Sequence, residues 1–432
     1  MNNIGLRKEE KPFETRVAVV PIHVKILAKK HKVKFILEPN EQRAFTSKEY
    51  ESAGAKIQPL KGSGTPVVLG IKEMPIDFFE SGIVYIFFSH TIKGQKYNMP
   101  MLQRILDVGA TLIDYERVLD KDGRRLIYFG NWAGMAGISD TFRSFGQRLK
   151  NRGIKPNPFA EMKPTLECKN LHELEDEFSK LGERIKKEGL ADSMTPFVVG
   201  FAGYGNVSKG AQRMFNLLPH KEVTPDILAD LPKDSHLIYK CVFKEEHMVE
   251  PKDNRAEFDL QDYYKYGSAK YKPIFHRYAP HLTIVLNCIY WSPKYPRLLT
   301  KNFIKENWGD ENSRLQAIGD ISCDVGGAIE FTLQTTNPGN PTFSYIVSED
   351  QAKVGIDGDG PLIMAVDNLP CELPRESSTS FSETLLDYIP ALAKADFTVS
   401  YEELELPKEL KDAVIVYQGK LTPTYEYLKM YL

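Results

Sequence analysis

The 432-residue sequence has few cysteines and no long apolar run, and both shortages exclude whole classes of protein. Its five cysteines, Cys168, Cys241, Cys288, Cys323 and Cys371, lie far apart and form no C-x-x-C pair, which argues against a disulfide framework or a structural zinc site. Cys241, Cys288 and Cys323 sit in apolar, strand-like runs, where we expect buried and unreactive thiols. No apolar run approaches the roughly 20 residues that span a bilayer, so we predict no membrane partner.

Excess charge of one sign and metal-binding motifs are also missing. The net charge is −2, so the basic domain expected of a nucleic-acid-binding protein is absent. The nine histidines form no H-E-x-x-H motif, and Asp357-Gly358-Asp359-Gly360 lacks the remaining ligands of a calcium loop. We therefore predict no metal site. The charged N-terminus lacks the apolar core of a signal peptide, and we expect a cytoplasmic protein.

What the sequence does contain is two successive stretches in which short apolar runs alternate with helical patterns, as in α/β proteins with parallel sheets. At this length two domains are expected. The first stretch predicts strands at 16–20, 33–37, 67–71, 83–88 and 111–114. The second predicts strands from residue 197 and at 237–243, 283–289, 317–321 and 362–366, after helices within 131–150 and 171–185. The charged residues 244–278 are expected at the surface.

A glycine turn follows the apolar run that starts at Phe197. The sequence Gly203-Tyr204-Gly205 joins this run to a helical pattern that opens with Asn206 and Val207. Free N–H groups at such a helix start attract a pyrophosphate. The third motif position is Ser208 instead of glycine, and many glycine turns precede helices that bind no nucleotide. The turn alone therefore leaves dinucleotide binding open.

Three polar segments directly follow predicted strands of the first stretch. Lys72 and Glu73 follow the strand at 67–71, His90 follows 83–88, and Glu116 follows 111–114. The carboxyl ends of parallel strands line the ligand crevice of α/β sheets, where a Lys, a His and a Glu would form a proton-transfer set. For each of them taken alone, a polar residue that merely ends a strand is the commoner explanation.

Two arginines and an aspartate also lie beside apolar runs. Arg16 and Arg125 suit carboxylate binding, although the sequence alone favours a surface ion pair for each of them. Asp324 follows the predicted strand at 317–321 and would either meet a cofactor ring or cap a helix.

In order and spacing, these motifs resemble the lysine-forming saccharopine dehydrogenases, also called lysine–2-oxoglutarate reductases, of the alanine dehydrogenase and transhydrogenase superfamily. The resemblance runs from about residue 4 to the C-terminus and is strongest to the reductase half of the bifunctional lysine-degrading enzyme. It rests on IGLRKEEKPFETRVAVVP, GIKEMP, FFSH, DYE, GYGNVSKGAQRMFNLLP, LNCIYWSPKYPRLLT, GDISCDVGGAIEF and VDNLPCELPRESS.

This resemblance implies an enzyme that condenses L-lysine with 2-oxoglutarate to saccharopine, or runs the reverse reaction, with NAD or NADP. It makes Lys72 and His90 the acid–base pair. The substrate-binding residues that it implies are Arg16, Lys11, Glu73, Glu116 and Arg125. The cofactor-binding residues that it implies are Gly203, Tyr204, Gly205, Asn206, Val207, Lys244, Glu245, Asn287, Cys288, Ile289 and Asp324.

The coenzyme stays open at this point. The distance from Gly203 to Glu245 exceeds the usual spacing of about 20 residues between glycine turn and ribose-binding acid, because residues 216–236 are inserted. Glu245 would accept ribose hydroxyls and repel a 2′-phosphate, whereas Lys244 would attract one. The balance favours NAD slightly.

By the resemblance, the fold is two Rossmann-like domains with parallel sheets flanked by helices and an active-site cleft between them. Residues 1–134 and 376–432 would form the substrate domain, and residues 135–375 the dinucleotide domain. One alternative is an alanine dehydrogenase that aminates a small 2-oxo acid. Another is a nucleotide-sensing module without turnover. The oligomeric state is not predicted.

Overall fold

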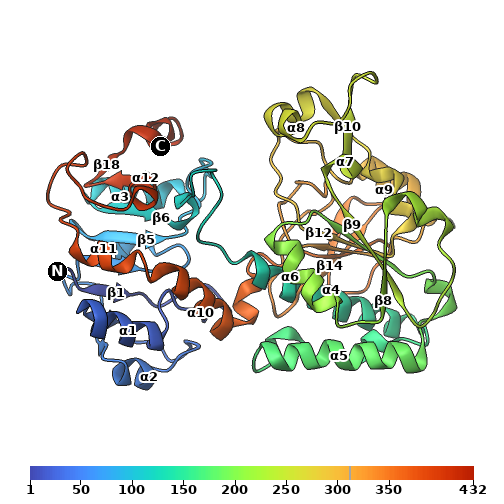
Figure 1. Cartoon of the computed structure of the whole chain (residues 1–432), viewed down its shortest axis with the longest axis horizontal. Helices are drawn as coiled ribbons and strands as arrows, with labels where there is room; N and C mark the ends of the chain where they lie inside the picture. The colour runs from blue at the N-terminus through green and yellow to red at the C-terminus, as the bar shows by residue number, and fades with distance from the viewer. Residues whose placement is uncertain (311–312) are drawn as a thin grey trace. The chain divides into compact units, whose positions relative to one another are not determined.

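The computed structural model describes residues 1–310 and 313–432 and divides into two units (Figure 1). Unit 1 comprises Met1–Phe129 and Pro374–Leu432, and unit 2 comprises Gly130–Leu373. Each unit is built on one eight-stranded sheet. The expected fold class, two Rossmann-like α/β domains, is confirmed.

The sheet of unit 1 has six parallel strands in an order that reverses at its centre. Its order is β18-β17-β6-β5-β4-β1-β2-β3, so the chain fills one side with β1 to β3 and then returns to the other side with β4 to β6. The antiparallel β17 and β18 extend the edge beyond β6. The strands are β1 (Ile4–Leu6), β2 (Phe35–Leu37), β3 (Lys56–Ile57), β4 (Val67–Leu69), β5 (Val84–Phe87), β6 (Thr111–Asp114), β17 (Val414–Tyr417) and β18 (Lys420–Leu421).

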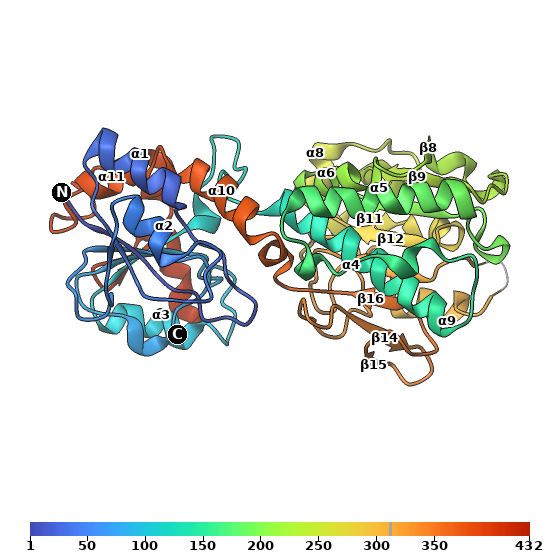
Figure 2. The same cartoon turned by 90° about the horizontal axis from the view of Figure 1, so that it is seen from below.

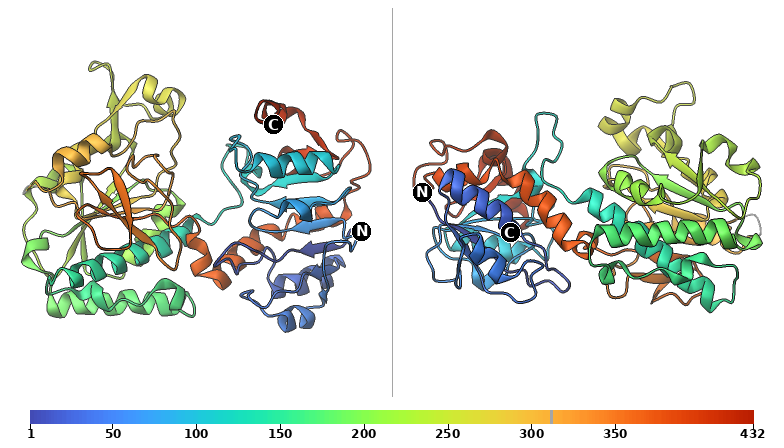
Figure 3. Two further views of the ribbon diagram at one scale, coloured as in Figure 1. Left: turned by 180° about the vertical axis from the view of Figure 1, so that it is seen from behind. Right: turned by 60° about the horizontal axis from the view of Figure 1, so that its bottom comes forward.

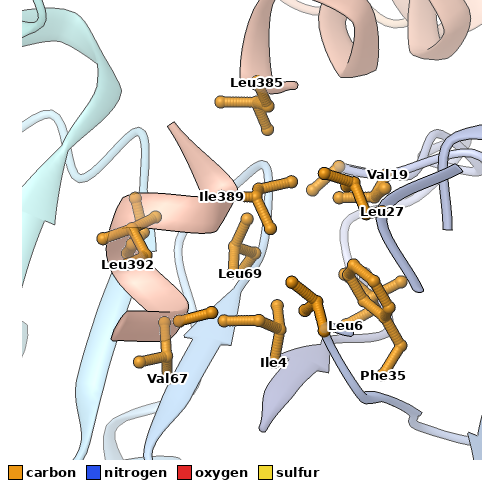
Figure 4. Close-up of a cluster of buried hydrophobic side chains, with 14 of the residues drawn as sticks. Ile4, Leu6, Val19, Leu27, Phe35, Val67, Leu69, Leu385, Ile389 and Leu392 are labelled. Atoms are coloured by element: carbon orange, nitrogen blue, oxygen red, sulfur yellow. The ribbon is translucent and has the colours of Figure 1, made fainter. Parts of the chain in front are cut away.

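Helices cover both faces of this sheet (Figure 2). On one face, α1 (Pro21–His31), α10 (Pro374–Leu385) and α11 (Ile389–Lys394) pack with α2 (Ser47–Ser52) and α12 (Lys408–Asp412). Figure 4 shows the centre of this core, where Leu385, Ile389 and Leu392 meet the strand residues Ile4 and Leu69. The other face is covered by α3 (Met99–Asp107) and the C-terminal 3-10 turns. Strands buried on both faces explain the continuous apolar runs of the sequence.

The predicted strand at Arg16–Val20 is wrong. These residues are buried, but their backbone joins no sheet and instead bonds to hydroxyls of α10. The N–H of Val17 donates to Ser378 Oγ (3.0 Å), and the N–H of Val20 donates to Ser382 Oγ (3.0 Å). A run of buried β-branched residues therefore resembled a strand although its backbone partners lie more than 350 positions away in the chain.

Unit 2 repeats the central reversal around β7. Its sheet has the order β15-β14-β16-β13-β12-β7-β9-β8. In this sheet β14 pairs in antiparallel fashion with β16 and with β15, and the other neighbouring strands are parallel. The strands are β7 (Val198–Ala202), β8 (His220–Val223), β9 (Ile238–Phe243), β12 (Ile284–Asn287), β13 (Ala317–Asp320), β14 (Thr342–Ile346), β15 (Gln351–Val354) and β16 (Leu362–Met364). The insert seen in the sequence supplies β8, so it extends the sheet at its edge.

One face of this sheet is covered by α4 (Gly130–Asn151), α5 (Leu171–Glu188) and α6 (Asn206–Phe215), with α4 and α5 side by side in Figure 3. The predicted helix within 171–185 is confirmed, and Leu174, Phe178, Leu181 and Ile185 form its buried face. On the other face lies α9 (Lys301–Asn307). The charged segment after β9 folds into α7 (Glu245–Met248), β10 (Val249–Pro251), α8 (Leu260–Tyr266) and β11 (Tyr271–Pro273).

Two glycines allow α4 and α6 to touch at backbone distance. A Cβ on Gly134 would lie 1.9 Å from the carbonyl oxygen of Val207, and one on Gly210 would lie 2.0 Å from the carbonyl oxygen of Asn131. Backbone atoms cannot move aside as a side-chain end can. Gly210, two residues beyond the imperfect third motif position, therefore serves helix packing.

We expect Gly210→Ala to lower the melting temperature by several degrees. Overpacking costs about 1–3 kcal/mol and outweighs the gain of about 1 kcal/mol from the better helix former. Thermal unfolding followed by circular dichroism measures the shift. Lys209→Ala, on the exposed side of the same helix, is the matched control and should melt like the wild type. Equal melting of the Gly210 variant and the wild type would mean that the helices separate without cost.

Candidate functional site

Polar residues gather at the carboxyl ends of four neighbouring parallel strands in unit 1. Strands β6, β5, β4 and β1 lie in that order in the sheet, and β1 and β4 flank the point where the strand order reverses. In open α/β sheets, ligands bind at such a point, outside the carboxyl ends of the strands. Lys72 and Glu73 follow β4, His90 follows β5, and Glu116 follows β6, so the predicted proton-transfer residues share one sheet edge.

Lys72 is buried among charges of both signs, and together burial and these charges lower the pKa of its side chain. Burial is the largest influence that lowers the pKa of its ammonium, and the charges of Arg16 and Lys11 lower it further, against the opposing effect of Glu14 and Glu73. A lysine with a lowered pKa is more often neutral near physiological pH and can accept a proton. The tertiary structure thus supplies the burial and the nearby cations that a base of this type needs.

Glu9 is a site residue that sequence reasoning did not single out. Its carboxylate accepts the backbone N–H of Ile71 (2.7 Å) and of Lys72 (3.0 Å), which ties the segment after β1 to the segment after β4. Burial and the nearby Glu14 raise the pKa of Glu9 to about 7, although the two N–H bonds oppose them. The one signal in the sequence that could have indicated this role is the position of Glu9 in the charged run after β1.

His90 and Glu73 form a hydrogen-bonded pair. Nδ1 of His90 lies 2.5 Å from Oε1 of Glu73, and both side chains are about one-third exposed. Burial alone would raise the pKa of Glu73, but the hydrogen bond and charge of His90 lower it to about 2. The ionised carboxylate orients the imidazole, so Nε2 is the ring nitrogen left for proton transfer.

Asp114, at the end of β6, holds the backbone on both sides of the site. Its Oδ2 accepts the N–H of Ser89 (3.1 Å) and also bonds the Ser89 hydroxyl, while Oδ1 accepts the N–H of Glu116 (2.7 Å). The amide of Asn98 donates to the carbonyl of His90 (3.2 Å), which has a left-handed backbone with φ 50°. Burial raises the pKa of Asp114 to about 6. These contacts fix the backbone positions of His90 and Glu116.

The predicted carboxylate-binding arginines already contact carboxylates of the protein. Arg16 is buried and donates from Nε and Nη2 to the two oxygens of Glu14, at 2.8 and 2.5 Å. Its guanidinium also stacks on Phe129, 4.2 Å from the ring centre. The pair is therefore buried instead of lying at the surface. Arg125 is about half exposed and bonds Glu116.

In unit 2 the glycine turn lies where the strand order reverses around β7. Gly203 has φ +93°, which only glycine adopts readily. A Cβ there would lie 3.0 Å from Ile289 Cγ2 and 3.5 Å from the Cys288 carbonyl oxygen, so the residues after β12 pack against the turn. The structure thus brings the predicted residues Gly203, Cys288 and Ile289 together.

The turn has the features of a dinucleotide cradle. A Cβ on Gly205 would meet nothing within 4 Å, so the space above the turn is open. Gly205 precedes α6 and offers no side-chain cap, which leaves the first N–H groups of Asn206 and Val207 for a ligand. A phosphate is attracted by such groups at a helix start. The residues present therefore fit the pyrophosphate of a dinucleotide.

Other predicted cofactor residues have internal partners. The side-chain amide of Asn287 donates to Asp320 (2.8 Å), so it joins β12 to β13. Burial raises the pKa of Cys288, in keeping with the expected unreactive thiol. Asp324 is half-buried in the turn after β13. The same turn contains Cys323, which is partly exposed and has φ 47°, so its predicted place in a buried strand is wrong.

Two surface cavities lie away from the predicted site residues. A surface cavity of about 570 Å³ in unit 1 is lined by residues that include Val20, Phe45 and Arg375, and one of about 290 Å³ in unit 2 is lined by residues that include Arg297 and Phe303. Neither includes a predicted site residue. Within residues 1–310 and 313–432, no group of His, Cys, Asp and Glu has the geometry of a metal site. No helix in this same range is long and apolar enough to cross a membrane.

Two family models match the chain. The model of the alanine dehydrogenase/PNT N-terminal domain matches residues 5–136, and that of the C-terminal domain matches residues 292–424. Residues 137–291 lie outside both matches. Among solved structures, an L-alanine dehydrogenase has a TM-score of 0.62 at 16% identity and covers 99% of both chains. A transhydrogenase from Sinorhizobium meliloti has a TM-score of 0.54 at 14% identity, covering 98% of this chain and all of the other. These two share the fold.

Curated relatives are more similar in sequence. The α-aminoadipic semialdehyde synthase of Arabidopsis thaliana is 36% identical over 91% of this chain, and the mitochondrial one of Rattus norvegicus is 32% identical over 99%. The chain spans 38% and 47% of these two proteins. The saccharopine dehydrogenase [NAD(+), L-lysine-forming] of Emericella nidulans is 29% identical over 89% of this chain and 90% of that protein.

The raised pKa of Glu9 predicts a pH-dependent contribution to stability. Since the folded protein keeps this proton up to about pH 7 while an unfolded glutamate loses it near 4.5, the contribution is complete below 4.5 and is lost as the pH rises through about 7. The melting temperature of the wild type relative to Glu9→Gln should therefore fall between pH 4.5 and 7.5.

Glu49→Gln is the control with the opposite sign. The hydrogen bond from Arg375 lowers the pKa of Glu49, so the wild type should lose its advantage over this variant as the pH falls toward 4. A pH-independent difference between the wild type and Glu9→Gln would mean that Glu9 titrates in the folded protein as it does in the unfolded chain.

Proposed function

We propose that this chain, which belongs to the alanine dehydrogenase/PNT family, is an NADH-dependent oxidoreductase that condenses L-lysine with 2-oxoglutarate to saccharopine, or catalyses the reverse. The names of its relatives support the reaction, and the saccharopine dehydrogenase of Emericella nidulans matches over 90% of its length. The observation that carries the proposal is the half-buried Lys72 beside the Glu73–His90 pair at the reversal point of unit 1.

The first chemical step needs a neutral amine and a polarised ketone. The ε-ammonium of substrate lysine must lose a proton before its nitrogen attacks C2 of 2-oxoglutarate. Lys72 accepts that proton, because burial, Arg16 and Lys11 favour its neutral form. After the attack, the amine nitrogen passes one of its own protons to the former ketone oxygen. His90 donates the second proton with which this oxygen leaves as water, and Glu73 stabilises the imidazolium that precedes this transfer. The product of these transfers is a protonated imine.

Reduction of the imine completes the reaction. Bound nicotinamide supplies the hydride that adds to the imine carbon and gives a secondary amine. The open turn at Gly205 and the uncapped start of α6 are the groups of this chain that would hold the cofactor pyrophosphate. Unit 2 is accordingly proposed as the dinucleotide domain, and unit 1 as the substrate domain.

The cations near Lys72 suit substrates that carry several carboxylates. 2-Oxoglutarate brings two and lysine brings one. Lys11 and Arg16 both act on the pKa of Lys72 and therefore lie near it, and Arg125 is the most exposed of the predicted arginines. We assign these side chains to carboxylate binding. For Arg125, binding a substrate carboxylate would compete with its bond to Glu116.

The coenzyme is assigned as NADH because of Glu245. This residue follows β9, the neighbour of β7, and the N–H of Gly203 donates to the carbonyl of Phe243 at the end of that strand (2.9 Å). An acid at this place accepts ribose hydroxyls, while a 2′-phosphate would meet a like charge.

The assay that tests the function follows NADH or NADPH absorbance with lysine and 2-oxoglutarate. We expect turnover with this pair that depends on both substrates, and none with pyruvate and ammonia. Turnover with pyruvate and ammonia alone would make the protein an alanine dehydrogenase. Cofactor binding by calorimetry without turnover on any pair would make it a nucleotide-binding module.

We expect Lys72→Met to lower kcat by about 10²–10⁴, the usual contribution of a positioned acid or base. The matched control, Lys56→Met, removes an exposed ammonium from the edge strand β3 and should keep wild-type turnover. Steady-state kinetics on folded variants measure the effect. Wild-type turnover of Lys72→Met would remove this lysine from the mechanism.

A further inference from the structure

Glu245 is held in place by tyrosines of the segment that follows β9. Oη of Tyr264 donates to Oε1 of Glu245 at 2.7 Å. Tyr204, between the two glycines of the turn, lies near the same carboxylate. Burial and the charge of Glu245 therefore raise the pKa of its phenol. The carboxylate is thus enclosed by one phenol from the turn and one from α8.

The support beneath Tyr264 is built from aromatic contacts. Tyr263, its neighbour in α8, packs against Tyr271 of β11 and against Tyr295, with both pairs of ring centres 5.3 Å apart. The Tyr295 hydroxyl also donates to the backbone carbonyl of Tyr264 (3.3 Å). Asp259 caps the start of α8 by accepting the N–H of Asp262 (2.6 Å). These contacts give α8 a defined position beside the glycine turn.

We propose that Tyr264 is a positioning residue for coenzyme choice, acting through Glu245. By holding this carboxylate beside the turn, Tyr264 makes the site favour NADH and reject the 2′-phosphate of NADPH. The proposal rests on the proposed function only in that unit 2 binds a nicotinamide dinucleotide. Tyr264 lies between the two family-model matches, so these models do not include it.

Charge decides the direction of the effect. A 2′-phosphate next to a fixed carboxylate meets like-charge repulsion. Lys244 is exposed, so its attraction is screened by water and salt. The half-buried, hydrogen-bonded Glu245 therefore outweighs Lys244.

The experiment measures the ratio of kcat/KM for NADH to that for NADPH in the wild type, Tyr264→Phe, Glu245→Gln and the double variant. We expect the wild type to prefer NADH at least tenfold, about 1.4 kcal/mol. Glu245→Gln should abolish the preference. Tyr264→Phe should lower it about threefold or more through the KM values, with kcat for NADH unchanged. In the Glu245→Gln background, Tyr264→Phe should have no further effect on the ratio.

Tyr266→Phe is the matched control. It removes a phenol from the same helix, where the Tyr266 ring contacts Lys270 instead of Glu245, and it should leave the ratio unchanged. Preference of the wild type for NADPH would overturn the proposal. So would an unchanged ratio in Tyr264→Phe, or equal effects of Tyr264→Phe with and without Glu245.

Binding titrations separate this proposal from the reaction. Quenching of NADH and NADPH fluorescence needs no second substrate, so the ratio of Kd values can be compared among the same variants even if lysine and 2-oxoglutarate do not react. The expected order of the variants is the same. Absence of binding to both coenzymes would overturn the inference, whereas binding with the predicted ratio but no turnover would overturn only the proposed reaction.

Discussion

The carboxylate of Glu9 joins the two halves of the unit 1 sheet at the point where the strand order reverses. Strands β1 and β4 are neighbours there, but the segments that leave them diverge, because β1 leads to one side of the sheet and β4 to the other. By accepting the N–H groups of Ile71 and Lys72, Glu9 fixes the position of the Lys72 backbone. Burying an ionised carboxylate costs free energy, and for this reason the pKa of Glu9 is raised.

Around this point the protein places charges in complementary pairs. Glu14 neutralises Arg16, Glu73 bonds His90, and Glu116 bonds Arg125. Lys72 is different, since burial and, after it, the charges of Arg16 and Lys11 lower the pKa of its ammonium. An arrangement that stabilises its neighbours as ions and destabilises one ammonium suits a site whose chemistry is proton transfer.

At the reversal point of the unit 2 sheet, glycines are the important residues. In the proposed dinucleotide site the backbone itself must come close to the ligand, and glycines make such an approach possible. Gly203 and Gly205 leave space above the turn, while Gly134 and Gly210 let α4 and α6 approach at backbone distance. The aromatic segment after β9 then places Glu245 beside the turn, and coenzyme choice is the role that we propose for this contact.

Much of this could be predicted from the sequence. Continuous apolar runs located every predicted strand but one to within two residues, because strands buried on both faces leave a simple pattern. Lys72, Glu73, His90 and Glu116 follow neighbouring strands at one sheet edge, as predicted. Three of the failures share one cause. Arg16–Val20 is as apolar as a strand, and only contact with Ser378 and Ser382 of α10 shows where its backbone bonds go. Likewise Glu9 and Tyr264 gain their roles from partners far along the chain, and no local pattern records such contacts. Apolar periodicity therefore determined the elements, whereas the pairing of charges and the altered pKa values arose only when the tertiary structure buried those groups together.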